Sequence, residues 1–363
     1  MKQIIVHFGG GALGRGLVIP LLVESGYDVI LADVDEKLLS EIKEKGGYPL
    51  FVTDEEPERQ RQFIPVLDTV STMKEQKKLS YYLEHSSAVT TAVRRENLIH
   101  VAKSLLTGYD GNHMLAVICA ENIEHVSGFM KGILEKAASS EEQMKKIPMF
   151  CIPDTIVDRI CSSNWPGNLE VNSEMYHELA VDQKTLADTH IKLIPAIDNI
   201  EGAFVRKRLM VNTFADASSF FALAKGKTYL HEAIEDKFIQ EELAPYFESF
   251  RILLSAKYNF SNEELDQWHA AYKKRLANPA IHRSLESVAR NLWVKMALDE
   301  RFVWPLLSLM VIGEDTDSGI SVLVNLLKQS TGESNAEIQN KLEDLWGNTE
   351  LGRKILSSAK RYL

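Results

Sequence analysis

The sequence predicts an α/β fold, a doubly wound parallel sheet, followed by a mainly α-helical C-terminal domain. In the first half, short β-branched runs alternate with segments of helical periodicity, which is typical of a sheet built from strand–helix–strand units. From about residue 198 the segments become long and amphipathic, and few runs resemble strands. This change in periodicity predicts two domains, residues 1–197 and 198–363.

Composition agrees with this organisation and argues against several classes of protein. The chain has 363 residues, of which 45% are hydrophobic and 25% charged, enough apolar material for a buried core in each of two domains. With 51 acidic and 41 basic residues, the formal net charge is -10. We therefore expect no nucleic acid and no membrane as partner, since both need a basic field. A small anionic substrate remains compatible, because a local cluster of Arg and Lys can bind one.

Cysteine usage and the start of the chain predict the compartment. The three cysteines, Cys119, Cys151 and Cys161, lack the spacing of a disulfide framework or a zinc site, so we expect no metal. The chain enters a strand-like run without a cationic leader, and no apolar run reaches the roughly 18 residues that span a bilayer. These features predict a cytoplasmic protein with reduced thiols.

A glycine-rich turn follows the first predicted strand, residues 3–8. It reads GGGALG and places glycines at Gly9, Gly11 and Gly14, immediately before an apolar helical segment. Gly9 permits a tight turn, Gly11 lets the backbone approach a pyrophosphate, and Gly14 allows the helix to lie close to the strand. The N–H groups of the helix start, which includes Ala12 and Leu13, favour phosphate binding.

A second predicted strand, residues 28–32, ends at Asp33. This carboxylate follows Gly9 by 24 residues, near the spacing of the acid that accepts hydrogen bonds from ribose hydroxyls. A 2′-phosphate would meet like charge there, reinforced by Asp35 and Glu36, so the sequence favours NAD over NADP. The ordered strand, turn, helix, strand and acid predict a Rossmann-type NAD-binding domain with an extension; a glycine turn that binds nothing is the alternative.

Further predicted strands cover residues 87–93, 114–120 and 148–153. The first carries Thr91 and Ala92 near its end, where the second half of a dinucleotide would lie. Asn122 and Asp158 follow later strands, and ligands of open parallel sheets bind beyond the carboxyl ends of strands. The alternative for Asn122 is a cap on the helix that follows it.

Three consecutive cations, Arg206, Lys207 and Arg208, stand out in the second half. On a helix, Asn212 lies close to the face that carries Lys207. A lysine that is desolvated or held beside a cation has a lowered pKa and can act as a general base. The alternative for such a triplet is a solvated helix face.

At these residues the chain resembles the polyol-specific long-chain dehydrogenases, the mannitol dehydrogenase family. The resemblance extends from the first strand to near the C-terminus. It is carried in order by His7–Gly16, Ala32–Val34, Val89–Val93, Glu121–Asn122, Val157–Ile160, Arg206–Lys207, Asn212–Thr213 and Asn278–Pro279. The later motifs are more specific than the nucleotide motif, which many families share.

The resemblance implies metal-independent hydride transfer between NAD and a sugar-alcohol carbon. The family motif is K-x4-N-x2-H, and Lys207 and Asn212 match its first two members. Lys207 would exchange the alcohol proton, while Asn122 and Asn212 would donate hydrogen bonds to the developing alkoxide. Asp158 is similar to the family's ligand for a substrate hydroxyl. The implied substrate is a small polyol or sugar phosphate, with mannitol 1-phosphate and fructose 6-phosphate as the first pair.

The chain departs from the family at two places. The histidine position of the motif is Ala215, and the glycine before it is Phe214; Asp216 is adjacent but would point elsewhere on a helix. An arginine-rich stretch after the Asn-Pro break is reduced to Arg290 and Lys295, with Arg301 beyond. Arg290 and Lys295 are the expected ligands of a substrate phosphate, and ordinary ion pairing is their alternative role.

These departures leave two further hypotheses open. One is a degenerate homologue that binds NAD(H) with little catalysis, as a sensor or regulator. The other is a reductase of the same broad family with a different substrate, such as a hexuronate.

Overall fold

A computed structural model describes residues 2–52, 60–185, 191–279 and 283–363. It divides into two compact units, Met1–Ile200 and Glu201–Leu363. The predicted domain boundary, after residue 197, falls close to this division.

The first unit is built on a six-stranded parallel sheet with the order β5-β2-β1-β6-β7-β8. The chain adds strands on one side of β1 and then crosses to β6 on the other side, so β1 and β6 flank a topological switch point, where ligands of such sheets bind. The strands are β1 (Ile4–Phe8), β2 (Asp28–Asp33), β5 (Asp68–Ser71), β6 (Ser86–Thr91), β7 (Leu115–Cys119) and β8 (Phe150–Cys151).

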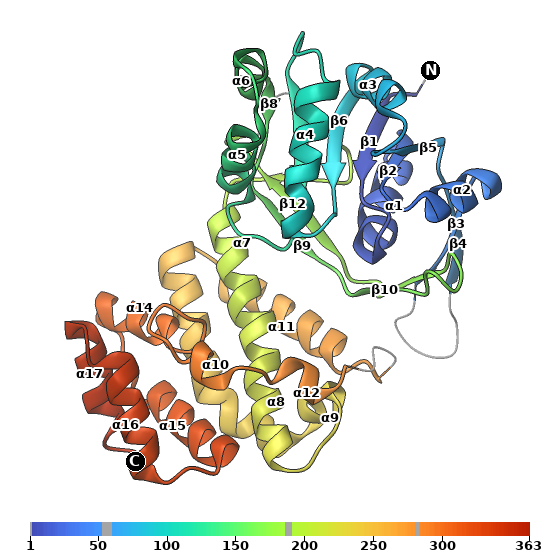
Figure 1. The fold of residues 1–363 in the computed structure, drawn as a ribbon. Helices are drawn as coiled ribbons and strands as arrows, with labels where there is room; N and C mark the ends of the chain where they lie inside the picture. The colour runs from blue at the N-terminus through green and yellow to red at the C-terminus, as the bar shows by residue number, and fades with distance from the viewer. Residues whose placement is uncertain (1, 53–59, 186–190, 280–282) are drawn as a thin grey trace. The chain divides into compact units, whose positions relative to one another are not determined.

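Strict alternation of buried side chains gives this sheet two separate cores. Ile5 and Val29 face one core and Val6 and Ile30 the other, as expected for strands covered on both faces. The first core receives α1 (Ile19–Glu24) and α2 (Glu36–Lys45); the second receives α3 (Gln76–Glu84), α4 (Leu98–Gly108) and α5 (Val126–Ala137) (Figure 1). The short helix α6 (Glu141–Lys146) leads into β8.

Two small sheets form the extension of the first unit. One contains β3 (Gly47–Val52), β4 (Gln60–Pro65), β10 (Cys161–Ser163) and β11 (Val171–Ser173); the other contains β9 (Thr155–Asp158), β12 (Glu178–Asp182) and β13 (Ala196–Ile197). Asp158 is therefore at the end of a strand that pairs antiparallel with β12. The expectation that Asp158 ends a strand of the parallel sheet is wrong.

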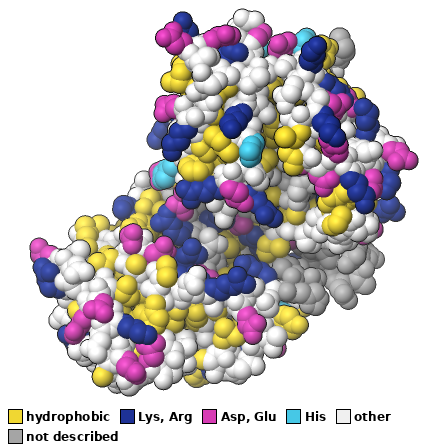
Figure 2. All heavy atoms as spheres, in the orientation of Figure 1, with side chains coloured by type: hydrophobic (Ala, Val, Ile, Leu, Met, Phe, Trp, Pro, Cys, Tyr) yellow, Lys and Arg dark blue, Asp and Glu magenta, His cyan; other side chains and the backbone are white. Residues whose placement is uncertain are grey.

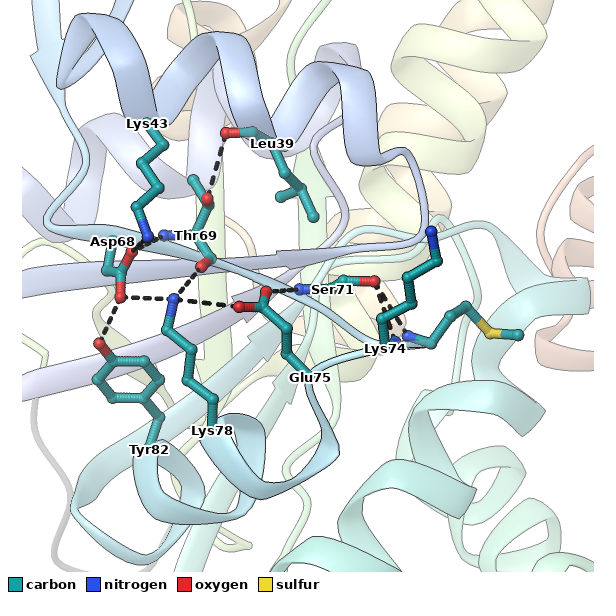
Figure 3. A network of polar contacts seen from close by, with 10 residues as sticks. Leu39, Lys43, Asp68, Thr69, Ser71, Lys74, Glu75, Lys78 and Tyr82 are labelled. Atoms are coloured by element: carbon teal, nitrogen blue, oxygen red, sulfur yellow. Dashed lines mark hydrogen bonds and ion pairs between the residues drawn. The ribbon is translucent and has the colours of Figure 1, made fainter.

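An ion-pair network closes the edge of the parallel sheet at β5 (Figure 3). The Asp68 carboxylate accepts from the Tyr82 hydroxyl at 2.6 Å and pairs with Lys78 at 2.8 Å and Lys43 at 3.2 Å. These donors hold the pKa of Asp68 well below its ordinary value, although burial opposes them. The network ties α2 and α3 to the edge strand.

The second unit is helical, which confirms the predicted C-terminal domain. Its first helix continues without a break from α7 (Ile200–Lys207) through a π-helical segment, η4 (Arg208–Thr213), into α8 (Phe214–Ala224) (Figure 1). The remaining helices are α9 (Leu230–Glu235), α10 (Lys237–Tyr258), α11 (Asn262–Leu276), α12 (Leu285–Val288), α13 (Leu292–Lys295), α14 (Trp304–Ile312), α15 (Asp317–Thr331), α16 (Asn335–Trp346) and α17 (Glu350–Ala359). Capping boxes at Ser261 and Ser334 fix where α11 and α16 begin.

Charges of both signs are interspersed on the face of the first unit shown in Figure 2. Within the described ranges, no helix is both long enough and apolar enough to cross a membrane. The same residues contain no group of three or more His, Cys, Asp and Glu side chains arranged to hold a metal ion.

Candidate active site

The glycine turn lies at the carboxyl end of β1, and its first and last glycines are required by the chain's own packing. Gly9 has a φ of +108°, and a Cβ there would lie 2.5 Å from the Ala92 carbonyl oxygen. A Cβ on Gly14 would collide with the Gly9 carbonyl oxygen and lie 2.5 Å from His7 Nε2. These two positions hold the helix start against β1 and the turn against the end of β6.

Gly11 differs, because a Cβ there would meet no heavy atom within 4 Å. Nothing in the chain itself therefore excludes a side chain at this position. The open space lies beside the first helical turn, whose N–H groups have no intrahelical partners. This arrangement fits a pyrophosphate that approaches the backbone at Gly11, Ala12 and Leu13.

His7, in β1, holds the glycine turn through a hydrogen bond. It is fully buried, and its Nε2–H donates to the Gly9 carbonyl at 3.0 Å, because a carbonyl can only accept. Nδ1 then accepts from the Thr90 hydroxyl at 2.8 Å. Burial lowers the pKa of His7 to about 4, so the ring is neutral at pH 7. His7 is a structural side chain of the turn.

Asp33 links the ends of β1 and β2 at the same edge of the sheet. Its Oδ2 accepts the Gly10 N–H at 2.6 Å, and its Oδ1 accepts the N–H groups of Val34 and Asp35 at 2.7 and 2.9 Å. A carboxylate offers about four lone-pair sites, so a half-buried Asp33 retains capacity for a ribose hydroxyl. Asp35 caps α2 and accepts the Trp165 indole N–H at 2.7 Å.

Arg15 also fixes the turn, and its role was not predicted from the sequence. This buried guanidinium donates to the Gly10 carbonyl at 2.6 Å, to the Leu169 carbonyl at 2.7 Å and to the Ser163 hydroxyl at 2.6 Å. It thereby joins the glycine turn to the extension near β10 and β11. The sequence signal for Arg15 was its position between Gly14 and Gly16, but two of its three partners, Leu169 and Ser163, lie about 150 residues away in the chain.

The ends of β6 and β7 meet next to the turn. The Glu121 side chain, 4% exposed, accepts the Thr91 hydroxyl at 2.7 Å and the Val93 N–H at 2.9 Å. Burial raises the pKa of Glu121, and these hydrogen bonds oppose the rise. Asn122 follows directly, and α5 begins only at Val126 with His125 as its N-cap. The capping alternative for Asn122 is therefore wrong.

In the second unit, the π segment explains the spacing of Lys207 and Asn212. In an α-helix, residues five apart lie about 140° apart around the axis. In a π-helix, hydrogen bonds join residues five apart, and such segments are common at functional sites. The segment Arg208–Thr213 therefore brings Lys207 and Asn212 to neighbouring positions on successive turns.

The cations on either side of Lys207 stack on aromatic rings. The Arg206 guanidinium lies 3.9 Å from the centroid of the Trp268 ring, and that of Arg208 lies 5.5 Å from Trp304. Arg206 and Lys207 are buried, Lys207 with 9% exposure. The alternative that this triplet is a solvated helix face is wrong.

Phe214 and Ala215, which stand in place of the glycine and histidine of the family motif, are both buried at the start of α8. Phe214 packs on Phe247, with ring centroids 4.6 Å apart, and edge-on against His269 at 5.4 Å. Ala215 is buried as well. Phe214 is therefore part of the helical core.

The predicted phosphate ligands do not converge on one point. Lys295 Nζ lies 2.9 Å from Asp216 Oδ2, and Arg301 Nη1 lies 3.2 Å from the same oxygen. Arg290 is exposed and donates to the Glu286 carbonyl of its own turn at 3.2 Å. The structure therefore shows ion pairing, the alternative role of Lys295. Asp158 belongs to the first unit and is buried there.

These features define a class: a dinucleotide-binding α/β unit joined to a helical unit with a buried lysine. Residues 3–194 match the mannitol dehydrogenase Rossmann domain, and residues 200–344 match the mannitol dehydrogenase C-terminal domain. The chain belongs to the mannitol dehydrogenase family. This is a family of NAD-dependent polyol dehydrogenases, which confirms the predicted class of enzyme and its cofactor.

Curated relatives and solved structures agree with this assignment. The chain is 26% identical to a mannitol-1-phosphate 5-dehydrogenase of Phaeosphaeria nodorum, covering 98% of this chain and 97% of the relative. It is 27% identical to one of Alternaria alternata, covering 86% and 82%. Its fold is similar to that of a substrate-free D-sorbitol dehydrogenase (TM-score 0.79, 15% identity, 99% and 93% covered). It is also similar to that of Pseudomonas fluorescens mannitol 2-dehydrogenase in a ternary complex with NAD and D-mannitol (0.69, 14%, 100% and 91%).

Proposed function

We propose that this protein interconverts a sugar alcohol, or its phosphate, and the corresponding ketose, with NAD as hydride carrier. The observation that carries the proposal is the π-helical segment Arg208–Thr213, which begins directly after Lys207 and contains Asn212. Mannitol 1-phosphate and fructose 6-phosphate are the first pair to test, because the curated relatives above carry the name mannitol-1-phosphate 5-dehydrogenase. Mannitol and fructose are the second pair, favoured by the pairing of Lys295 with Asp216.

Each residue has a distinct task in this reaction. Lys207 takes the proton of the alcohol as hydride leaves the adjoining carbon, and returns it to the carbonyl oxygen in the reverse direction. Asn212 and Asn122 donate hydrogen bonds to the oxygen while it carries negative charge. Asp158 accepts a hydrogen bond from a neighbouring substrate hydroxyl. For a phosphorylated substrate, Arg290 and Lys295 are the proposed phosphate ligands, and Lys295 would then leave its ion pair with Asp216.

The cofactor would be held by the glycine turn and the adjoining strand ends. NAD supplies the hydride acceptor. The turn residues would bind its pyrophosphate, Asp33 its ribose, and the ends of β6 and β7 its nicotinamide half. The residues concerned are Gly9, Gly11, Ala12, Leu13, Gly14, Asp33, Thr91, Ala92 and Asn122. A cytoplasmic location is part of the proposal, supported by three cysteines that are thiols and not disulfides.

Ala215 removes one positioning hydrogen bond and leaves the proton-transfer group in place. Loss of one such donor costs on the order of 100-fold in rate. We therefore expect slow turnover that still depends on Lys207.

The test is an NADH-linked assay with mannitol 1-phosphate, fructose 6-phosphate, mannitol and fructose in both directions, with NADPH in parallel. The expected result is turnover of at least one pair, faster with NADH than with NADPH. No turnover of any pair would contradict the proposal. Tight NADH binding in calorimetry without turnover on a wider panel of polyols and uronates would favour the sensor hypothesis.

A further inference from the structure

The second unit contains a buried carboxylate, Asp216, to which the proposed reaction gives no task. Asp216 is 5% exposed, and one of its oxygens, Oδ2, accepts from both Lys295 and Arg301, at 2.9 and 3.2 Å. The two cations come from a different part of the chain, around α13. Burial raises the pKa of Asp216, while both cations oppose the rise.

Asp216 lies one helical turn beyond the proposed reaction centre. It follows Asn212 by four residues in the same continuous helix, and side chains four apart share a face. One turn advances about 5.4 Å along the axis, a distance that the chain of a six-carbon polyol can span. A polyol that reacts at Lys207 and Asn212 can therefore bring its unreacted end to Asp216.

The charges around Asp216 cancel. Lys295 and Arg301 contribute two positive charges, and Asp216 contributes one negative charge. Glu300 contributes the second negative charge, and its Oε2 lies 3.9 Å from Arg301 Nε. The formal sum of these four groups is zero.

Zero net charge favours a hydroxyl over a phosphate at this position. A phosphate needs charged donors that are directed at it, whereas both cations here already contact a carboxylate. A phosphate close to Lys295 would also face Asp216, and two anions in contact repel each other. A hydroxyl, by contrast, can donate to the carboxylate and accept from a cation.

We propose that Asp216 is a specificity-determining residue that neutralises Lys295 and Arg301 and so favours polyols with an uncharged end over polyol phosphates. The inference rests on the proposed function, because it places the reacting end of the substrate at Lys207 and Asn212. It gives Lys295 the task of holding Asp216, in place of the phosphate contact proposed above for a phosphorylated substrate.

The first test is Asp216→Asn in the full chain, which keeps the shape of the side chain and one oxygen acceptor. The measured quantity is the ratio of kcat/KM for fructose 6-phosphate to that for fructose, both with NADH. We expect this ratio to rise at least tenfold. The matched control is Asp317→Asn, which removes an exposed carboxylate paired with Arg361 at 2.6 Å and leaves the ratio unchanged. An unchanged ratio in Asp216→Asn overturns the inference.

A second measurement covers the case in which Asp216→Asn does not fold, and it uses the wild-type protein. Because the four charges cancel, we expect kcat/KM for fructose to exceed that for fructose 6-phosphate at least tenfold, both with NADH. An equal or higher kcat/KM for fructose 6-phosphate overturns the inference.

Failure of the proposed function is distinguishable from failure of this inference. If the wild-type protein reduces neither sugar, the proposed function fails. The role of Asp216 is then tested by the binding of inorganic phosphate. Calorimetric titration with inorganic phosphate then compares the wild type with Asp216→Asn. Binding that is at least tenfold tighter in the variant supports the inference, and equal binding overturns it.

Discussion

The glycine turn of the first unit and the lysine helix of the second are organised by different parts of the chain. In the turn, positions are fixed by backbone contacts, so Gly9 and Gly14 admit no side chain while Gly11 stays open. In the helix, positions are fixed by a local change of helical twist and by ion pairs with distant residues. The comparison shows that positions fixed by backbone geometry leave a short sequence motif, whereas a pairing of distant side chains, such as Asp216 with Lys295, leaves none.

The largest expected effect comes from the lysine helix. Lys207→Met removes the proposed proton-transfer group, so kcat falls by about 1,000-fold, within the range for general acid–base catalysis. NADH affinity stays within about twofold of the wild type, because this task lies outside the glycine turn. Stopped-flow assays and calorimetric titration measure the two quantities.

Lys354→Met is the matched control for this variant. Lys354 is exposed and pairs only with Glu350 in the described part of the chain, at 3.0 Å, so its removal leaves kcat unchanged. If Lys207→Met retains more than a tenth of the wild-type kcat, Lys207 is not the general base.

His7 gives a large effect in the first unit. Its pKa of about 4, against an ordinary 6.5, means that the folded state resists protonation while the unfolded state does not. The stability that this provides is complete above pH 6.5 and is lost as the pH falls towards 4. At about 1.4 kcal/mol per pKa unit, the loss reaches about 3 kcal/mol.

His7→Gln, which keeps a donor for the Gly9 carbonyl, removes this titration. Scanning calorimetry of the full chain between pH 7 and pH 4 checks the prediction. The wild type should lose more stability than the variant over this interval. If the free energies of unfolding of the wild type and the variant change in parallel with pH, protonation of His7 is not linked to folding.

The smallest expected effects come from Gly14 and Gly11, two glycines that have different roles in the turn. Gly14→Ala introduces a collision with backbone and a buried ring, so the free energy of unfolding falls by about 1–3 kcal/mol. Gly11→Ala meets no atom of the chain, so its thermal midpoint is unchanged while NADH affinity falls about tenfold. Thermal melts and NADH titrations of both variants provide the comparison. A lower thermal midpoint with full NADH affinity in Gly11→Ala would contradict the cofactor role of this position.

The difference between the two regions also explains what the sequence could predict. The strand predicted at residues 3–8 is β1 (Ile4–Phe8), and the one at 28–32 is β2 (Asp28–Asp33), because both are buried apolar runs with clear ends. The two small sheets were not predicted. Five of their strands have only two to five residues, and β3 and β4, with six residues each, contain prolines and polar residues without a regular period. The strand expected at 148–153 shortens to β8 (Phe150–Cys151) because a 3₁₀ turn precedes it.

At the candidate site, the sequence could not predict contacts between residues that lie far apart in the chain. The spacing of Lys207 and Asn212 is visible in the sequence, but the π-helix that aligns them is not. The pairing of Asp216 with Lys295 and Arg301 joins residues about 80 positions apart. No local pattern encodes such a pair, so Lys295, one of the two expected phosphate ligands, could not be recognised as the partner of a carboxylate.

Hydride transfer between NAD and a polyol carbon can be followed directly with an isotope. Fructose and fructose 6-phosphate are each incubated with NADH that carries deuterium at both C4 positions of its nicotinamide, and the polyol product is analysed by mass spectrometry. We expect one deuterium per polyol molecule, bound to the former carbonyl carbon, and about 1,000-fold slower formation with Lys207→Met. A polyol without deuterium, or no polyol from either sugar, would contradict this hydride transfer.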